Sequence, residues 1–183
     1  AKVLGYTRKD VFKFSEYSIP ERLKKLEPRK FWEARDDVLA ACADAKAKFI
    51  ACICHHSIAG GTAQLDAKFI QFGANEVLKT FNDYLRVMDR HGYCILDNIP
   101  SKSPFAYIRE KHQRGLVYES VGRPDRLLSR IHGYAHTCVE ASYSHSAVDI
   151  VLGIFRSCIN EQKRPELARR QMARVAKLLW TTP

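Results

Sequence analysis

Apolar residues recur at two spacings along the chain, and each spacing predicts one kind of element. Steps of three and four residues place apolar side chains on one face of a helix. Helices are therefore expected over 21–26, 29–45, 74–91, 105–113, 144–160 and 163–180. Two short, nearly continuous apolar runs, 48–55 and 93–96, predict strands covered on both faces. Gly73 is expected to break the chain before the helix that follows it.

The order of these elements predicts the fold class. Helices that alternate with buried strands are typical of an α/β domain, in which a sheet lies between flanking helices. The chain has 183 residues, which is the usual size of one domain. Residues 1–183 are therefore expected to form a single domain that ends in a basic helix over 163–180.

Composition excludes disorder and a membrane-spanning segment. Hydrophobic residues make up 46% of the chain and charged residues 27%, which is typical of a protein with a packed core. The longest apolar runs are far shorter than the roughly 20 residues of a transmembrane helix. Six cysteines without a CxxC pair indicate small buried side chains in a reducing compartment, and we expect a cytoplasmic location.

The charge balance favours a polyanionic partner. Lysine and arginine outnumber aspartate and glutamate by 30 to 20, for a net charge of +10. A field of this sign attracts nucleic acid and also anionic membrane surfaces. Six basic residues and one acidic residue lie within 163–180, so this helix carries half of the excess charge. It either follows a phosphate backbone or presents a solvated basic face.

The candidate nucleic-acid contacts on this helix are its arginines and one lysine. They are Arg164, Arg169, Arg170, Arg174 and Lys177. On the apolar side of the same helix, Ala168, Met172, Val175 and Leu179 are expected to dock on the domain. Lys163 adds to the basic side.

Asp97 is the first candidate for chemistry because it directly follows a predicted strand. Ligands of α/β proteins bind at the carboxyl ends of such strands. A carboxylate there supplies the oxygen ligand that Mg²⁺ and Mn²⁺ prefer. The alternative is that Asp97 caps a turn completed by Asn98 and Pro100.

Asp149 is the second candidate because it interrupts an apolar helical stretch. A buried carboxylate without a partner is costly, so such a residue commonly faces a cleft, a metal or a cation. Its neighbours on the helix face, which include His145 and Gly153, are mixed in polarity and mostly small, so they suit either an open cleft or a solvent-exposed surface. Both interpretations stay open.

Several short motifs resemble the "domain of unknown function 3800" family, which has a ribonuclease H-like fold. The resemblance lies in the strand that ends at Asp97, then Ser142, Ser144 and the helix around Asp149. Upstream, Phe-Lys-Phe-Ser over 12–15, followed by a helix that contains Phe-Trp at 31–32, is similar to the family's lysine motif. The resemblance implies a ribonuclease H-like mixed sheet with flanking helices.

The resemblance also implies a nuclease that cleaves phosphodiester bonds with two metal ions. In such enzymes carboxylates from separate elements hold two ions about 4 Å apart, which activate water and stabilise the leaving oxygen. Asp97 and Asp149 would be catalytic ligands of Mg²⁺ or Mn²⁺, with Lys13 near the phosphate. Nucleic acid would be the substrate.

This chain departs from the family pattern at its beginning. The family's first strand carries Asp-Glu-Ser, which is absent here, and Val11 stands where an acidic residue is expected. The chain also starts at Ala1 without a methionine, so we expect an N-terminally incomplete piece. Two rival functions follow: a catalytically incomplete module that binds nucleic acid or a partner, and an assembly component whose sheet is completed by another chain.

Two histidine and cysteine groups are weaker metal candidates. Cys52, Cys54 and His55 alternate along a predicted strand, which sends the histidine to the opposite face from the cysteines. His132, His136 and Cys138 have suitable spacing, but no second pair accompanies them. A packed strand is the preferred interpretation of the first group.

Overall fold

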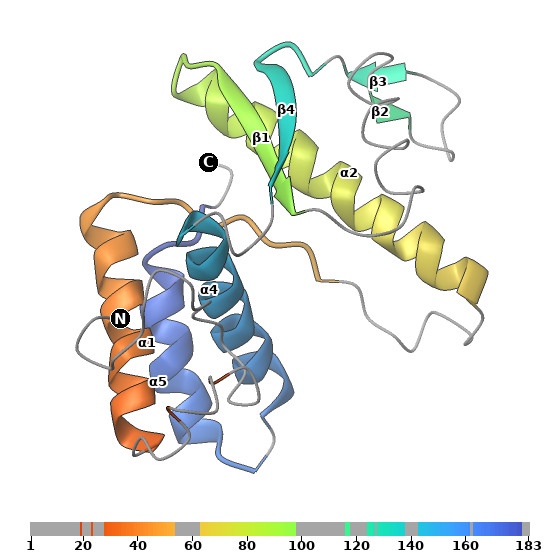
Figure 1. Cartoon of the computed structure of the whole chain (residues 1–183). Helices are drawn as coiled ribbons and strands as arrows, with labels where there is room; N and C mark the ends of the chain where they lie inside the picture. The colour runs from red at the N-terminus through yellow and green to blue at the C-terminus, as the bar shows by residue number, and fades with distance from the viewer. Residues whose placement is uncertain are drawn as a thin grey trace. The chain divides into compact units, whose positions relative to one another are not determined.

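A computed structural model describes most of the chain. The described residues are 28–53, 63–97, 116–117, 124–126, 128–137, 143–161 and 163–180, together with Ile19 and Leu23. Their elements are α1 (Pro28–Asp44), α2 (Ala63–Val87), β1 (Gly92–Asp97), β2 (Leu116–Val117), β3 (Pro124–Arg126), β4 (Ile131–Thr137), α4 (Tyr143–Asn160) and α5 (Pro165–Ala176) (Figure 1). The α/β fold class is thus confirmed, with helix predominating. Lys13 and the helix predicted over 105–113 lie outside the described residues.

The chain divides into two compact units. The first consists of Ala1–Phe49 and Thr137–Leu179, and the second of Ile50–His136 and Trp180–Pro183. The described helices of the first unit are α1, α4 and α5, whereas α2 and the strands belong to the second. The expectation of a single domain over 1–183 stays a prediction.

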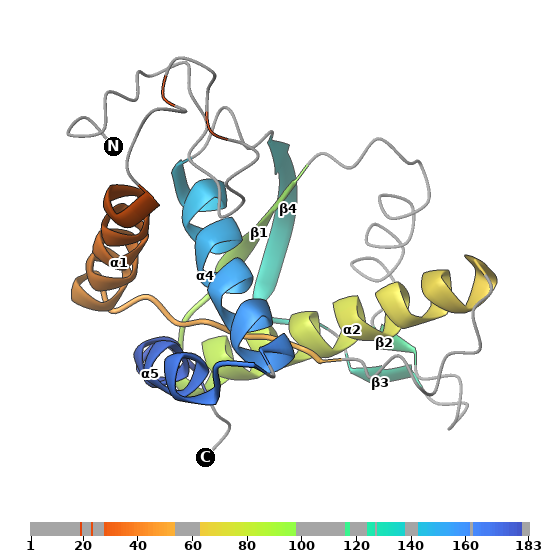
Figure 2. The same cartoon turned by 90° about the horizontal axis from the view of Figure 1, so that it is seen from below.

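Three helices pack side by side in the first unit, and their buried faces form its core (Figure 2). On α1, Phe31, Arg35 and Leu39 are buried at four-residue steps, as helix geometry requires of a single buried face. On α4 the buried residues of this core are Ile150, Val151, Ile154, Phe155 and Cys158. Ala168 and Val175 of α5 and Leu178, which follows α5, complete it. The helices predicted over 29–45, 144–160 and 163–180 are therefore confirmed, although α5 ends at Ala176.

The buried face of α4 is rotated from the one that the sequence predicts. Val151 and Phe155 are buried as expected, but Val148 and Leu152 are exposed. Ile150 and Ile154 take their place in the core. Because α4 contacts both α1 and α5, its buried face is centred between these two neighbours rather than on the most obvious apolar stripe.

The strand predicted over 48–55 is wrong in the described part of that range. Phe49 forms a single parallel bridge with Leu179, and its N–H donates to the Leu178 carbonyl at 2.7 Å. Residues 50–53 form no strand, and Ile53 is exposed. The Phe49 ring packs edge-on against Phe155 at 5.5 Å instead, so the apolar run is used partly for helix packing.

In the second unit, α2 packs against β1 and β4. β1 and β4 run parallel, and the Gly92 N–H donates to the Arg130 carbonyl at 2.9 Å, where both strands begin (Figure 1). The core residues are Leu78, Leu85, Leu128 and Ile131, with Phe81, Tyr84 and Cys94 packed against them. A Cβ on Gly92 would lie 3.0 Å from side-chain atoms of Leu85 and Phe81, so a larger residue here would require these two side chains to shift by a few tenths of an ångström.

Two predictions for this unit need correction. α2 begins at Ala63 and runs through Gly73 without a break, because a single glycine costs a helix only about 1 kcal/mol. β1 forms at the predicted place, but Tyr93 and Ile95 are 70% and 60% exposed. This strand is therefore covered on one face instead of two. Completion of the sheet by another chain stays a prediction.

β2 and β3 pair antiparallel as a second small sheet. In the part of the chain that the structure describes, no helix is both long and apolar enough to cross a membrane.

Asn82 is expected to be important for the stability of the second unit. Its side chain is 5% exposed, and its Oδ1 accepts the Arg130 N–H at 3.0 Å, across 48 residues of sequence. Replacing it with alanine leaves a partly buried N–H without its acceptor. We expect Asn82→Ala to lower the free energy of unfolding by about 1–3 kcal/mol in urea titrations.

The matched control is Asn160→Ala, since Asn160 is exposed at the end of α4. Exposed substitutions usually change stability by less than about 0.5 kcal/mol. Equal effects of the two variants would contradict a special role of the Asn82 contact.

Candidate nucleic-acid interface

The two predicted metal ligands lie in different units. Asp97 is the last residue of β1, in the second unit. Asp149 lies on α4 in the first unit, is half-buried and has a polar contact of its own. Within the described ranges, no group of three or more histidine, cysteine, aspartate or glutamate side chains could hold a metal ion. A shared metal site of Asp97 and Asp149 stays a prediction.

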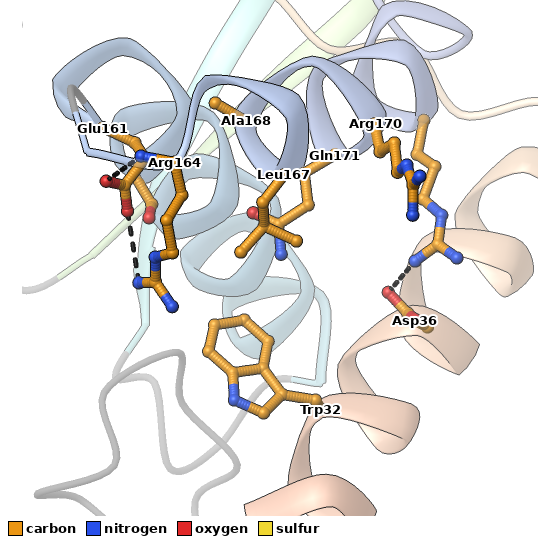
Figure 3. A pocket seen from close by; sticks show the side chains of 10 residues that line it. Trp32, Asp36, Glu161, Arg164, Leu167, Ala168, Arg170 and Gln171 are labelled. Atoms are coloured by element: carbon orange, nitrogen blue, oxygen red, sulfur yellow. Dashed lines mark hydrogen bonds and ion pairs between the residues drawn. The ribbon is translucent and has the colours of Figure 1, made fainter.

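The first unit contains a pocket of about 430 Å³. Trp32 and Asp36 of α1 form one wall (Figure 3). The opposite wall is formed by residues of α5 and the segment before it, among them Glu161, Arg164, Leu167, Arg170 and Arg174. Three of the five predicted nucleic-acid contacts therefore line a single pocket.

One face of α5 carries a row of cations that continues from this pocket. Arg170, Arg174 and Lys177 follow at steps of four and three residues, which places them on one side of a helix. Lys177 keeps helical backbone angles as the C-terminal cap, so it continues the row. All three side chains belong to exposed residues. We call these three residues the basic face.

Arg169 lies on a different side of α5. Its guanidinium Nη1 is 2.9 Å from a carboxylate oxygen of Glu166, and both side chains are exposed. Successive residues of a helix differ in direction by about 100°. Arg169 is thus directed away from its neighbour Arg170 and from the basic face.

Cations exceed carboxylates around the pocket. Arg174 forms an ion pair with Asp36 (Figure 3). Arg164 is paired with Glu161 at 3.2 Å. For Arg170, the structure shows no ion pair among the residues it describes. The pocket therefore keeps a positive charge beyond its internal pairs.

The Glu161 carboxylate is fixed by several donors. It accepts the N–H groups of Lys163 and Arg164 at 2.9 and 3.0 Å, in addition to the Arg164 guanidinium. Desolvation raises the pKa of the Glu161 carboxyl, but these donors together outweigh it and hold the pKa below its usual value. Glu161 consequently stays ionised at neutral pH and orients Arg164.

Trp32 is held in place from within its own helix. The Arg35 guanidinium lies 4.4 Å from the centre of the Trp32 ring and 4.3 Å from that of Phe31. Arg35 is only 1% exposed, so these cation–π contacts are desolvated and strong for their kind. The contact limits the orientations of the indole that forms the pocket wall.

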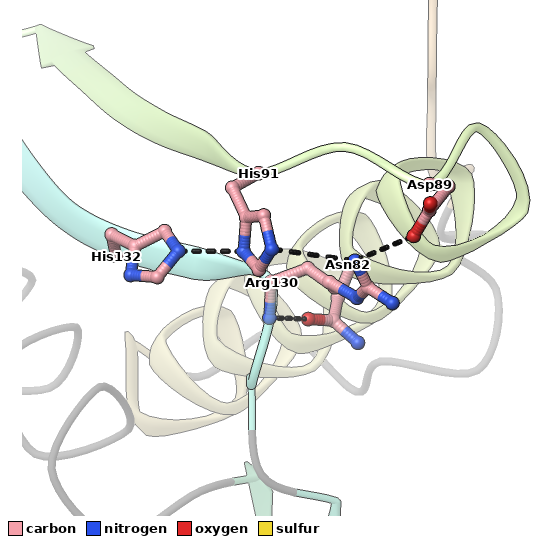
Figure 4. A network of polar contacts seen from close by, with 5 residues as sticks. All are labelled: Asn82, Asp89, His91, Arg130 and His132. Atoms are coloured by element: carbon pink, nitrogen blue, oxygen red, sulfur yellow. Dashed lines mark hydrogen bonds and ion pairs between the residues drawn. The ribbon is translucent and has the colours of Figure 1, made fainter.

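A second polar cluster lies in the second unit, where Arg130 joins Asp89 and two histidines (Figure 4). Nη1 of Arg130 lies 3.4 Å from Nε2 of His91. Nδ1 of His91 in turn lies 2.6 Å from Nε2 of His132, so one of these two nitrogens donates to the other. Both facing nitrogens are used in this hydrogen bond, which favours a structural contact over metal binding.

Three of the described cysteines, Cys42, Cys94 and Cys158, are poor nucleophiles. Burial raises the pKa of Cys94 to about 11 and also raises the pKa values of Cys42 and Cys158. These thiols are protonated at neutral pH, and the thiolate is the reactive form. The expectation of buried cysteines is met by Cys158, whereas Cys42, Cys52 and Cys94 are half-buried. Cys54 and Cys138 lie outside the described residues.

Sequence reasoning identified the cations of this site but not its other wall. In the sequence, Trp32 stands out as an apolar helix residue and as part of the Phe-Trp pair of the family resemblance, whereas nothing marks Asp36 or Glu161 as site residues. Trp32 and Asp36 lie four residues apart on α1. This spacing is the one local signal in the sequence that could have predicted that both side chains lie on the same helix face.

Comparison of the chain with protein-family models, with curated proteins and with solved structures found no match. The fold and the site define an α/β protein with an arginine-rich pocket and an adjoining row of cations.

Proposed function

We propose that the first unit binds the phosphate backbone of nucleic acid through the basic face. The observation that carries this proposal is the row Arg170, Arg174 and Lys177 on one side of α5. The row extends for about 10 Å along the helix axis, long enough to meet more than one phosphate group. Arginine is also well suited to phosphate, because its planar group donates two parallel hydrogen bonds.

The charges of the whole chain support the same partner. The net charge of +10 attracts a polyanion over long range, and release of condensed counterions drives the binding. The basic face then gives the polyanion a defined place on the surface. A merely solvated face would give attraction without a preferred position.

Arg170 and Arg169 provide a matched test, because they are neighbours with the same chemistry on different sides of α5. A labelled single strand of about 12 nucleotides is titrated with the full chain in about 50 mM salt, and fluorescence anisotropy is measured. Arg170→Gln is expected to weaken binding about two- to fivefold, the usual effect of one exposed ion pair. Arg169→Gln is expected to have a smaller effect, since Glu166 already pairs with this residue.

Both variants lower the net charge by the same amount. Equal losses would therefore mean that only total charge matters, and the assignment of the basic face would be wrong. The absence of binding by the unchanged chain would exclude the proposed function altogether.

The second candidate function is hydrolysis of phosphodiester bonds by a ribonuclease H-like domain of the domain of unknown function 3800 family. One observation favours it: Asp97 ends β1, which runs parallel to β4, and ligands of α/β proteins lie at such strand ends. Asp97 and Asp149 would hold Mg²⁺ or Mn²⁺, whose preferred ligands are carboxylate oxygens. The bound ions would polarise the phosphate and activate water.

Hydrolysis is tested by incubating the bound strand with Mg²⁺ or Mn²⁺, and with a chelator as the blank. Cleavage by the full chain that disappears in Asp97→Asn and in Asp149→Asn, with binding retained, would support this candidate. Cleavage that survives both substitutions, or no cleavage by the unchanged chain, would exclude it.

A further inference from the structure

We infer that the pocket beside the basic face holds one unpaired nucleobase, stacked on Trp32, so that the chain selects single-stranded over double-stranded nucleic acid. This inference rests on the proposed function and names the form of nucleic acid that the site takes.

The size and walls of the pocket suit a flat aromatic guest. Its volume of about 430 Å³ lies within the range of pockets that bind small organic ligands. Trp32 and Leu167 supply apolar surface, and both are directed into the same space as Arg164 (Figure 3). Base stacking on an aromatic ring is tolerant of sequence, because every base presents a π-face.

Polar groups on the same walls suit the edge of a base. The Gln171 side chain lines the pocket, and its Oε1 accepts a weak hydrogen bond from the Cys158 thiol at 3.9 Å. This contact turns the carbonyl toward Cys158 and leaves the amide NH₂ to donate to an acceptor on a base. The Glu161 carboxylate lines the same pocket, but its Oε1 already accepts the N–H groups of Lys163 and Arg164 and its Oε2 accepts the Arg164 guanidinium, so its part is to orient Arg164.

The pocket and the basic face share residues. Arg170 and Arg174 line the pocket and also belong to the basic face. A strand whose phosphates lie along the basic face therefore passes the mouth of the pocket, and one of its bases can turn inward. In a duplex the bases are paired and stacked inside the helix, so none can enter without the cost of unpairing.

Arg35 limits the motion of the Trp32 ring on which the base would stack. It lies against the Trp32 ring and is almost fully buried, so the indole is ordered before a base arrives. A ring that is already ordered loses less conformational entropy on binding. The buried Arg35 guanidinium also attracts the π-electrons of the Trp32 ring through a cation–π contact.

The test compares one labelled strand of about 12 nucleotides with the duplex of the same sequence, using the full chain. The unchanged chain is expected to bind the single strand at least about fivefold more tightly than the duplex. Trp32→Ala is expected to lose at least about fivefold on the single strand, the lower end of the stacking contribution, and less than twofold on the duplex. Trp32→Phe, which keeps an aromatic ring, should retain most of the preference.

A fluorescence measurement keeps the inference falsifiable if Trp32→Ala does not fold. The chain has two tryptophans, so Trp180→Phe leaves Trp32 as the only one. Its emission is expected to be quenched to saturation by the single strand and to change little with the duplex. Binding of the single strand without quenching would overturn the stacking.

The two proposals fail differently. Equal affinity for single strand and duplex, with a loss in Arg170→Gln that Arg169→Gln does not show, would overturn the base pocket and leave the proposed function standing. A chain that binds neither form would overturn the proposed function itself.

Discussion

A chain with Phe31→Ala is expected to lose about 3–5 kcal/mol of its free energy of unfolding in the first unit. Phe31 is 2% exposed, and its ring lies in the core that α1 forms with α4 and α5. Truncation removes buried apolar surface and leaves a cavity. It also removes one of the two rings that contact the buried Arg35 guanidinium. Urea denaturation followed by circular dichroism measures the loss.

The control is the same substitution on an exposed phenylalanine. Phe72 on α2 is 50% exposed, so Phe72→Ala deletes the same atoms from a half-solvated position. Its cost is expected to be below about 1.5 kcal/mol. Equal destabilisation by the two variants would mean that Phe31 is not part of a packed core.

Neutralising the whole basic face is expected to weaken binding of a single strand by roughly 10- to 100-fold in about 50 mM salt. The variant carries Arg170→Gln, Arg174→Gln and Lys177→Gln. Each phosphate contact contributes about 0.7 to the slope of log affinity against log salt for single strands, so the slope should fall by about 2. Anisotropy titrations at several salt concentrations measure the affinity and the slope together.

The control removes three charges elsewhere in the first unit. Lys30, Lys48 and Arg156 are exposed and do not line the pocket. Their replacement by glutamine lowers the net charge equally but should leave most of the salt slope intact. If both triple variants behaved alike, binding would be diffuse and the basic face would not be a site.

The helices could be predicted where apolar spacing continued over several turns. The helix expected over 29–45 became α1, and the one over 144–160 became α4, because each must bury one face. The run at 48–55 was too short to distinguish a strand from other buried segments. Its partners Phe155 and Leu179, both more than a hundred residues away, show how Phe49 is used.

The candidate site was partly predictable for a similar reason. The cations of α5 are visible as local charge, and their steps of four and three residues identify one face. The pocket needs Trp32 and Asp36 from α1, and this approach of α1 to α5 depends on packing over long range. Burial could not be predicted either, because Tyr93 and Ile95 have the composition of a core strand and are nevertheless exposed.

The most direct test of nucleic-acid binding by α5 is a ¹H–¹⁵N NMR titration of the full chain with a short single strand. We expect amide shifts at Arg170, Arg174 and Lys177 and at the indole N–H of Trp32, with the amides of the second unit nearly unchanged. A titration that leaves these four residues unshifted while the strand binds, or that shows no binding, would contradict the account.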